Sequence, residues 1–62
     1  MTKEQVERFV NLSELLPRLE AHGVRPSGLK KEYMELGNIV YGEWHNNPEQ
    51  FLKNMREWGF SV

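Results

Sequence analysis

Apolar side chains recur at intervals of three and four residues in the middle of the chain, and this periodicity constrains the fold more than any other feature. The members of this stripe are Leu29, Tyr33, Leu36, Val40 and Trp44. An α-helix turns once every 3.6 residues, so this spacing places the side chains on one helical face. The sequence therefore predicts a helix over residues 28–45. Gly37 and Gly42 lie inside it, and they indicate either a close approach by another backbone or a locally weak helix.

A second apolar stripe runs through the first third of the chain. Its members are Val6, Phe9, Val10, Leu12, Leu15, Leu16 and Leu19. Thr2 and Gln5 precede it at the spacing of a capping box, in which each side chain satisfies a free backbone N–H group. The sequence therefore predicts a helix that begins near residue 3.

Pro17 lies inside this stripe and opens two interpretations. Proline has no N–H group and its ring clashes with the preceding turn, so a straight helix through it costs about 3 kcal/mol. We expect a break, with a short helix over residues 3–11 followed by a second helix over 13–22 that Ser13 caps. A single kinked helix over 3–22 is the alternative.

Two glycines are placed to end helices. Gly23 follows the first stripe, and Gly59 follows a shorter apolar stripe near the C-terminus. Glycine adopts a positive φ at low cost, so both positions favour a Schellman ending. In this geometry Phe60 folds back onto Met55.

Cap residues are also placed to begin helices. Ser27 is expected to cap the helix over 28–45. Asn47 is expected to cap a third main helix over 48–58, with Pro48 at its first position.

These elements predict a single all-α domain over residues 1–62, a small three- to four-helix bundle. A core of this size rarely supplies more than about 3–5 kcal/mol of net stability. The chain has no cysteine, which excludes disulfides and thiolate zinc sites as additional support. A partner chain remains as the means of supplementing the core.

The apolar pattern and the net charge of the chain indicate where the protein is located and what it binds. No apolar run approaches the roughly 18 residues that cross a bilayer, and no signal peptide is visible. We therefore expect a cytoplasmic protein, complete from its own start codon, without a membrane partner. A formal net charge of −1 excludes strong overall attraction to nucleic acid, although a local basic patch is compatible with it.

Catalytic and metal-binding patterns are missing from the sequence. There is no nucleophile–base spacing, glycine-rich phosphate loop or pair of carboxylates, so we expect neither enzymatic activity nor a cofactor. Zinc needs three or four convergent ligands. His22 and His45 are far apart in the sequence, and we interpret them as surface histidines and expect no metal site.

A basic cluster surrounds the segment 22–31. Its candidate nucleic-acid-binding residues are Arg18, Arg25, Lys30 and Lys31. A helix-turn-helix would use residues 13–22 as its first helix and residue 27 onward for recognition. However, Arg25 and Pro26 lengthen the turn, and Glu32 adds repulsive charge. An ordinary solvated loop is the interpretation that we favour.

Large aromatic side chains gather in the last third of the chain. The candidate partner-binding residues are Tyr41, Trp44, Trp58 and Phe60. Aromatic residues are enriched at interface cores and hot spots. Tyr41 lies off the main stripe of its helix, whereas the spacing of Trp44 is typical of a core position. Phe60 and Val62 lie at a terminus. The alternative is that all of these side chains pack internally.

Three short segments resemble, in order, the theta subunit family of bacterial DNA polymerase III. They are Leu19-Glu20-Ala21-His22-Gly23-Val24, Lys31-Glu32-Tyr33 and Pro48-Glu49. Proteins of that family are small and helical and bind the proofreading exonuclease subunit. The resemblance, which needs gaps, implies a binding module and transfers no site residues.

The sequence thus favours a small non-enzymatic protein-interaction module: a regulator, inhibitor or accessory subunit. Its size suits a phage- or plasmid-encoded chain. The expected partner is another protein or a second copy, in an isologous homodimer. The alternative is a DNA-binding regulator that uses the basic segment 22–31.

Overall fold

Each periodic segment forms a helix in the computed structural model of the protein, which describes residues 1–61. Helix α1 spans Lys3–Ala21, α2 spans Ser27–Asn46 and α3 spans Pro48–Glu57. Residues 1–61 contain no strand. The prediction of an all-α fold is therefore confirmed.

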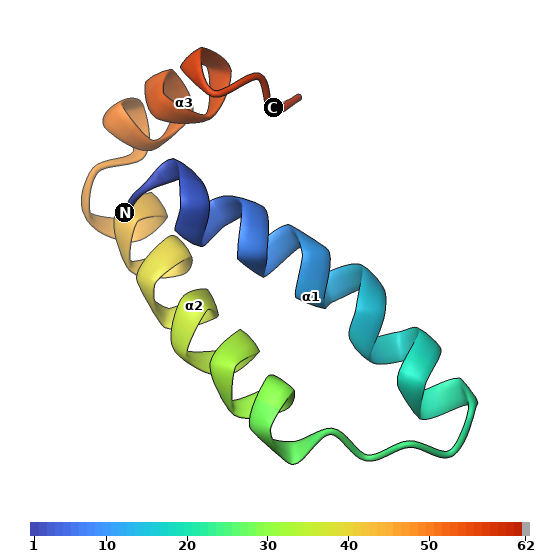
Figure 1. The fold of residues 1–62 in the computed structure, drawn as a ribbon. Helices are drawn as coiled ribbons and strands as arrows, with labels where there is room; N and C mark the ends of the chain where they lie inside the picture. Colours follow the sequence, from blue (N-terminus) through green and yellow to red (C-terminus); the bar gives the residue numbers. More distant parts are fainter. Residues whose placement is uncertain (62) are drawn as a thin grey trace.

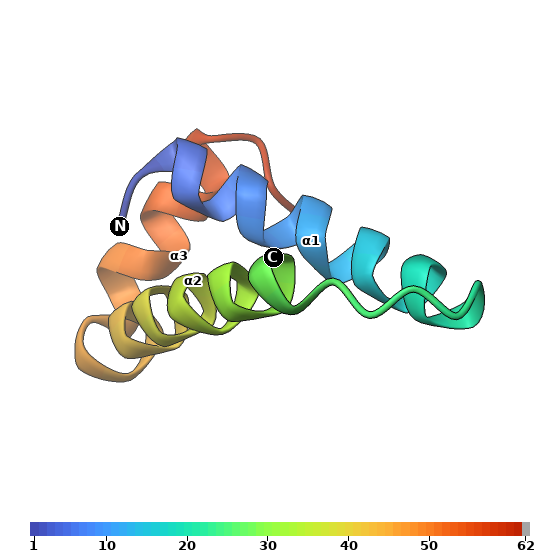
Figure 2. The ribbon, with the colours of Figure 1, turned by 60° about the horizontal axis from the view of Figure 1, so that its bottom comes forward.

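The first two helices form an antiparallel hairpin. Helices α1 and α2 lie side by side, and residues 22–26 run back from the end of α1 to the start of α2 (Figures 1 and 2). Helix α3 crosses the opposite end of the hairpin, close to the start of α1 and the end of α2 (Figure 2). The result is an elongated molecule with principal extents of 39 × 20 × 15 Å.

The core lies where the three helices meet, at the end of the hairpin away from the connecting loop. One buried side chain from each helix contributes to it: Val6, Val40 and Met55. We call these three residues the core cluster. Six partly buried side chains pack against it: Met1, Phe9, Val10, Phe51, Trp58 and Phe60.

Helix α1 continues through Pro17, so the predicted break is wrong. Ser13 lies inside this continuous helix and therefore caps no second helix. Its Oγ donates a hydrogen bond to the carbonyl of Val10 at 2.6 Å. Leu12 is 0% exposed and Leu16 is 7% exposed, and a break before Leu12 would disturb its burial. Fully burying a leucine is worth about 1.5–3 kcal/mol, which matches the cost of about 3 kcal/mol for a proline inside a helix.

Local capping signals at the start of α1 are confirmed. The backbone N–H of Gln5 donates to Thr2 Oγ1 at 3.2 Å, and the backbone N–H of Thr2 donates to Gln5 Oε1 at 2.9 Å. This reciprocal pair is the predicted capping box.

Both predicted Schellman endings are present. Gly23 has a φ of 79° and Gly59 a φ of 86°. After Gly59, the N–H of Phe60 donates to the carbonyl of Met55 at 2.9 Å. This turn directs Phe60 back toward the core cluster, as predicted.

The starts of α2 and α3 differ in part from the prediction. Ser27 is the first residue of α2 rather than its cap, and no side chain caps that helix. Asn47 does precede α3, with Pro48 at its start, but its side chain makes no capping hydrogen bond. Asn47 also ends α2, since its N–H donates to the carbonyl of Glu43 at 2.9 Å. A single residue thus serves as the whole connection between two helices.

Candidate functional site

The four candidate aromatic residues separate into two pairs. Tyr41 is 61% exposed and Trp44 is 43% exposed. Trp58 and Phe60 are partly buried and pack against the core cluster. The structure therefore brings Tyr41 and Trp44 to the surface and places Trp58 and Phe60 inward. Val62, the other terminal apolar residue of the sequence, lies outside the described residues.

A shallow apolar groove lies at the corner between α2 and α3. We call it the aromatic groove, with a volume of about 280 Å³. Its lining residues are Val40, Tyr41, Trp44, Phe51 and Leu52. The rings of Trp44 and Phe51 meet edge to face, with centroids 5.3 Å apart and an interplanar angle of 65°. This geometry is a favourable one for two aromatic rings. The contact therefore holds Phe51, on the α3 side of the groove, against Trp44 of α2.

Tyr41 is supported from the α1 side by an aromatic cluster. The ring of Phe9 stacks on the ring of Tyr33, with centroids 4.9 Å apart. It also lies at 87° to the ring of Tyr41, with centroids 6.1 Å apart. Gly37 makes room for Phe9, because a Cβ at this position would lie 3.4 Å from Phe9 Cε1. The close approach predicted at Gly37 is thus made by a side chain rather than a backbone. A Cβ added at Gly42 would meet no neighbouring atom within 4 Å, so no close approach is found there, and the alternative of a locally weak helix stays a prediction.

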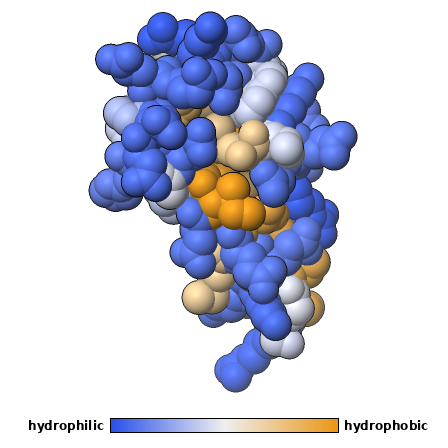
Figure 3. All heavy atoms as spheres, turned by 90° about the vertical axis from the view of Figure 1, so that its left-hand side faces the viewer, coloured by the Kyte–Doolittle hydropathy of each residue, from blue (hydrophilic) through white to orange (hydrophobic). Residues whose placement is uncertain are grey.

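Helix α2 carries most of the exposed large apolar side chains in residues 1–61. Four of the six exposed large apolar side chains in residues 1–61 lie on it: Met34, Ile39, Tyr41 and Trp44. The side of the molecule on the left of Figure 1 shows a cluster of apolar atoms within a mostly hydrophilic surface (Figure 3). Of these four residues, only Trp44 belongs to the periodic stripe, and Met34, Ile39 and Tyr41 lie off it.

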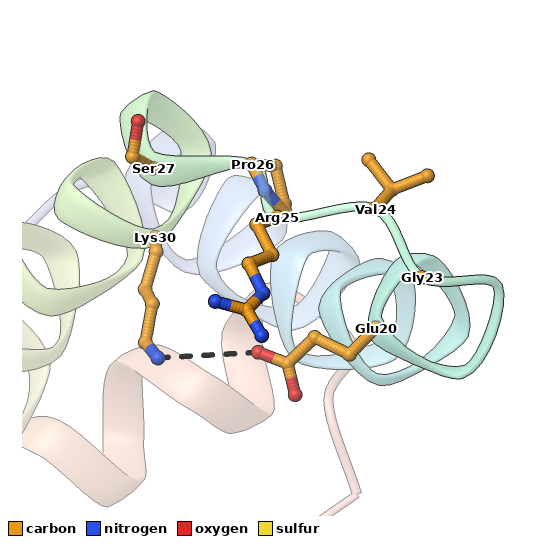
Figure 4. A pocket seen from close by; sticks show the side chains of 7 residues that line it. All are labelled: Glu20, Gly23, Val24, Arg25, Pro26, Ser27 and Lys30. Carbon is orange, nitrogen blue, oxygen red and sulfur yellow. Dashed lines mark ion pairs between the residues drawn. The ribbon is translucent and has the colours of Figure 1, made fainter.

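The basic loop forms a second, more polar hollow. We call it the loop pocket, with a volume of about 550 Å³. Its lining residues are Glu20, Gly23, Val24, Arg25, Pro26, Ser27 and Lys30. Arg25 and Lys30 extend toward Glu20 (Figure 4), and Lys30 Nζ lies 4.0 Å from Glu20 Oε1. The carboxylate of Glu20 therefore offsets part of the positive charge that a phosphate would need.

The remaining basic candidates do not complete a phosphate site. Arg18 and Lys31 are exposed and do not line the loop pocket. The separate first helix of a helix-turn-helix is missing, because α1 is continuous. Helices α1 and α2 also run antiparallel (Figure 2), whereas the helices of that motif lie at about 90–120°. Nucleic-acid binding by this loop stays a prediction.

Arg8 and Glu32 tie α1 to α2 with a bidentate ion pair. Arg8 Nε donates to Glu32 Oε1 at 2.8 Å, and Arg8 Nη2 donates to Glu32 Oε2 at 3.2 Å. These hydrogen bonds, with the favourable charge interaction, lower the pKa of Glu32 and raise the pKa of Arg8. Glu32 thus has a structural partner within the chain.

Neither a metal site nor a membrane-spanning helix is found in the described part of the chain. In residues 1–61, no three His, Cys, Asp or Glu side chains are grouped so as to hold a metal ion. Within that range, none of the helices is both long enough and apolar enough to cross a membrane. No protein-family model, curated protein or solved structure matches the chain. The resemblance to the theta subunit family therefore gains no support from these comparisons.

Proposed function

We propose that this chain is a non-enzymatic protein-interaction module that binds a partner protein through the aromatic groove. In this proposal the three helices act as a small bundle whose exposed corner the partner covers, and the chain serves as a cytoplasmic regulator, inhibitor or accessory subunit. The observation that carries the proposal is the exposure of Tyr41 and Trp44 beside an apolar groove.

The chemistry of the groove favours a protein as the ligand. Its five lining residues present aliphatic and aromatic surface with a single hydroxyl, that of Tyr41. Tyrosine and tryptophan are enriched among interface hot spots, where truncation to alanine costs about 2 kcal/mol or more. Contiguous apolar surface that polar residues surround is typical of protein-binding sites.

The small number of buried apolar side chains gives a second reason for an interacting surface. Only five apolar side chains in residues 1–61 are buried: Val6, Leu12, Leu16, Val40 and Met55. A larger aromatic side chain, Trp44, is left partly in water instead. Covering it in a complex would remove apolar area from water, at about 25 cal/mol per Å².

The test is affinity capture from the cells that produce the protein, with two differently tagged copies co-expressed. The bait is compared with a double variant, Tyr41→Ala with Trp44→Ala. The matched control is Leu15→Ala, since Leu15 is an apolar residue of α1 that is 39% exposed. Quantitative mass spectrometry then measures each captured protein, including the second tagged copy.

We expect at least one captured protein to be retained by the bait and by Leu15→Ala and lost from the double variant. Identical recovery with all three baits would contradict the proposal. Circular dichroism of each variant verifies that the helices are intact, so that loss of binding is not loss of fold.

A further inference from the structure

Charged residues are divided unevenly along the chain. Residues 17–31 hold four of the eight lysine and arginine residues but only one of the nine acidic residues. This segment therefore has a formal charge of +3, whereas the rest of the chain has a formal charge of −4. It comprises the end of α1, the connecting loop and the start of α2, so positive charge is concentrated at the loop end of the hairpin (Figure 1). A local surplus of one charge attracts partners of the opposite charge.

An open crevice between α1 and α2 lies at this positive end. The loop pocket adjoins a second hollow of about 260 Å³, and Glu20 and Lys30 line both hollows. We call the two hollows together the hairpin crevice. Apolar groups from both helices line the second hollow: Leu16, Pro17, Met34 and the ring of Tyr33. The hairpin crevice therefore combines a charged part with an apolar part.

Two cations of the hairpin crevice are available to a ligand. Arg25 is exposed and forms no ion pair within residues 1–61. Lys30 Nζ lies 4.0 Å from Glu20 Oε1, and both side chains are more than half exposed, so this ion pair is weak. Arg25 and Lys30 extend toward the same carboxylate, that of Glu20 (Figure 4). A carboxylate that enters the loop pocket would meet both positive charges and replace Glu20 as the partner of Lys30.

The two hollows suit different parts of one ligand. Beside the apolar hollow, Met34 is 62% exposed, and methionine adapts well to an irregular apolar partner. A peptide segment supplies both an apolar side chain and a carboxylate, and its backbone N–H groups can donate to the carboxylate of Glu20. A phosphodiester backbone has no such donor and carries a negative charge at every nucleotide. Glu20 therefore favours a peptide over a nucleic acid.

We infer that the hairpin crevice binds an acidic segment of a partner protein, with a carboxylate at Arg25 and Lys30 and a neighbouring large apolar side chain against Met34. This inference goes beyond the proposed function, because it assigns a second interaction surface at the end of α2 away from the aromatic groove. Arg18 and Lys31 do not line the crevice, but their charges add to the positive potential that attracts the acidic segment.

Selection of random short peptides displayed on phage, with the immobilised full chain as bait, tests the inference first. We expect the recovered peptides to be enriched in Asp and Glu beside a large apolar residue. The crevice variant, Arg25→Ala with Lys30→Ala, should lose this enrichment. The matched control, Lys53→Ala with Arg56→Ala, removes two exposed charges from α3 and should retain it. Peptides without acidic enrichment, or equal loss in the two variants, would overturn the inference.

Fluorescence anisotropy with a labelled selected peptide tests the arrangement of charges. The crevice variant should raise the dissociation constant at least about tenfold, and the control variant should leave it nearly unchanged. Glu20→Gln should lower the dissociation constant, because the amide keeps an acceptor oxygen but neither repels the ligand nor pairs with Lys30. Weaker binding by Glu20→Gln would contradict the arrangement. Circular dichroism verifies that each variant keeps its helices.

Two further measurements separate the inference from its alternatives. The double variant Tyr41→Ala with Trp44→Ala should leave the dissociation constant of the peptide unchanged. Weakening equal to that of the crevice variant would assign the peptide to the aromatic groove, which overturns the inference and leaves the proposed function intact. A labelled DNA duplex should bind more weakly than the peptide at the same salt concentration. A duplex that binds more tightly would assign the hairpin crevice to nucleic acid and overturn the inference.

Discussion

The two ends of the helical hairpin differ in how many helices pack there, although Leu12 and Leu16 extend the buried apolar contact of α1 between them. At the end that α3 crosses, Val6, Val40 and Met55 form a buried apolar cluster. At the loop end, an exposed pair, Lys30 and Glu20, lies 4.0 Å apart beside the open loop pocket. Exposed ion pairs contribute only about 0–1 kcal/mol, so most of the stability should come from the apolar end. The aromatic groove therefore lies at the end where three helices pack together, and the basic residues lie at the end where only α1 and α2 meet.

The largest expected effect comes from the apolar end. Met55→Ala should lower the free energy of unfolding by about 2–5 kcal/mol, because it leaves a cavity in the core cluster. Met34→Ala, the same change at an exposed site, should stay within about 0.5 kcal/mol when measured at a concentration where the chain is monomeric. Urea unfolding monitored by circular dichroism measures both. Similar losses for the two variants would mean that stability is not concentrated in the cluster.

Alanine substitutions at the two helix-ending glycines, Gly23 and Gly59, compare the stability of the two ends directly. A Cβ added to Gly23 or to Gly59 would have no neighbouring atom within 4 Å, so alanine at either site mainly adds the strain of a positive φ, about 1–2 kcal/mol. Gly59→Ala should cost more than Gly23→Ala, since it also disturbs the return of Phe60 to the core cluster. Thermal or urea unfolding gives the ranking, and a larger loss from Gly23→Ala would reverse the comparison.

These local endings show which parts of the fold are readable from sequence. Thr2 with Gln5, and each glycine with the residue after it, act through backbone groups a few positions away, so their roles could be predicted. The course of α1 through Pro17 could not, because it depends on the burial of Leu12, which is set by packing between helices.

The candidate site was only partly predictable for the same reason. Trp44 and Trp58 both lie at regular spacings in apolar stripes, yet Trp44 is exposed and Trp58 packs on the core cluster. The difference depends on how the helices pack against one another, which local spacing does not specify. The link from Arg8 to Glu32 spans 24 positions, and no local pattern indicates it.

The ion pair between Arg8 and Glu32 should affect the free energy of unfolding less than the core and glycine substitutions do. Its hydrogen bonds lower the pKa of Glu32 below the ordinary value of 4.5. The pair therefore contributes stability above that value, and the contribution is lost as the pH falls through the lowered pKa. Because both side chains are exposed, we expect a modest change. Urea titrations at neutral and acidic pH should show a weaker pH dependence for Glu32→Gln, and an identical dependence would contradict the assignment.

The smallest expected effect is at the loop pocket. We expect no tight complex with a defined DNA duplex at physiological salt, because Glu20 offsets part of the charge of Arg25 and Lys30. Any weak binding should fall steeply with salt, and replacing Lys30 and Lys31 with alanine should flatten that slope. Fluorescence anisotropy with a labelled duplex measures this. A nanomolar complex would make the loop, rather than the aromatic groove, the leading site.

The fluorescence of Trp44 tests the role of the aromatic groove most directly. Trp58→Phe leaves Trp44 as the single tryptophan, on the wall of the groove and 43% exposed. If the groove is covered by a second copy, its emission should shift to shorter wavelength and become protected from acrylamide quenching as the protein concentration rises. In the converse variant, Trp44→Phe, the signal of Trp58 should stay nearly constant. Trp44 emission and quenching that stay constant over the concentration range, and on addition of every captured protein, would contradict a binding role for the groove.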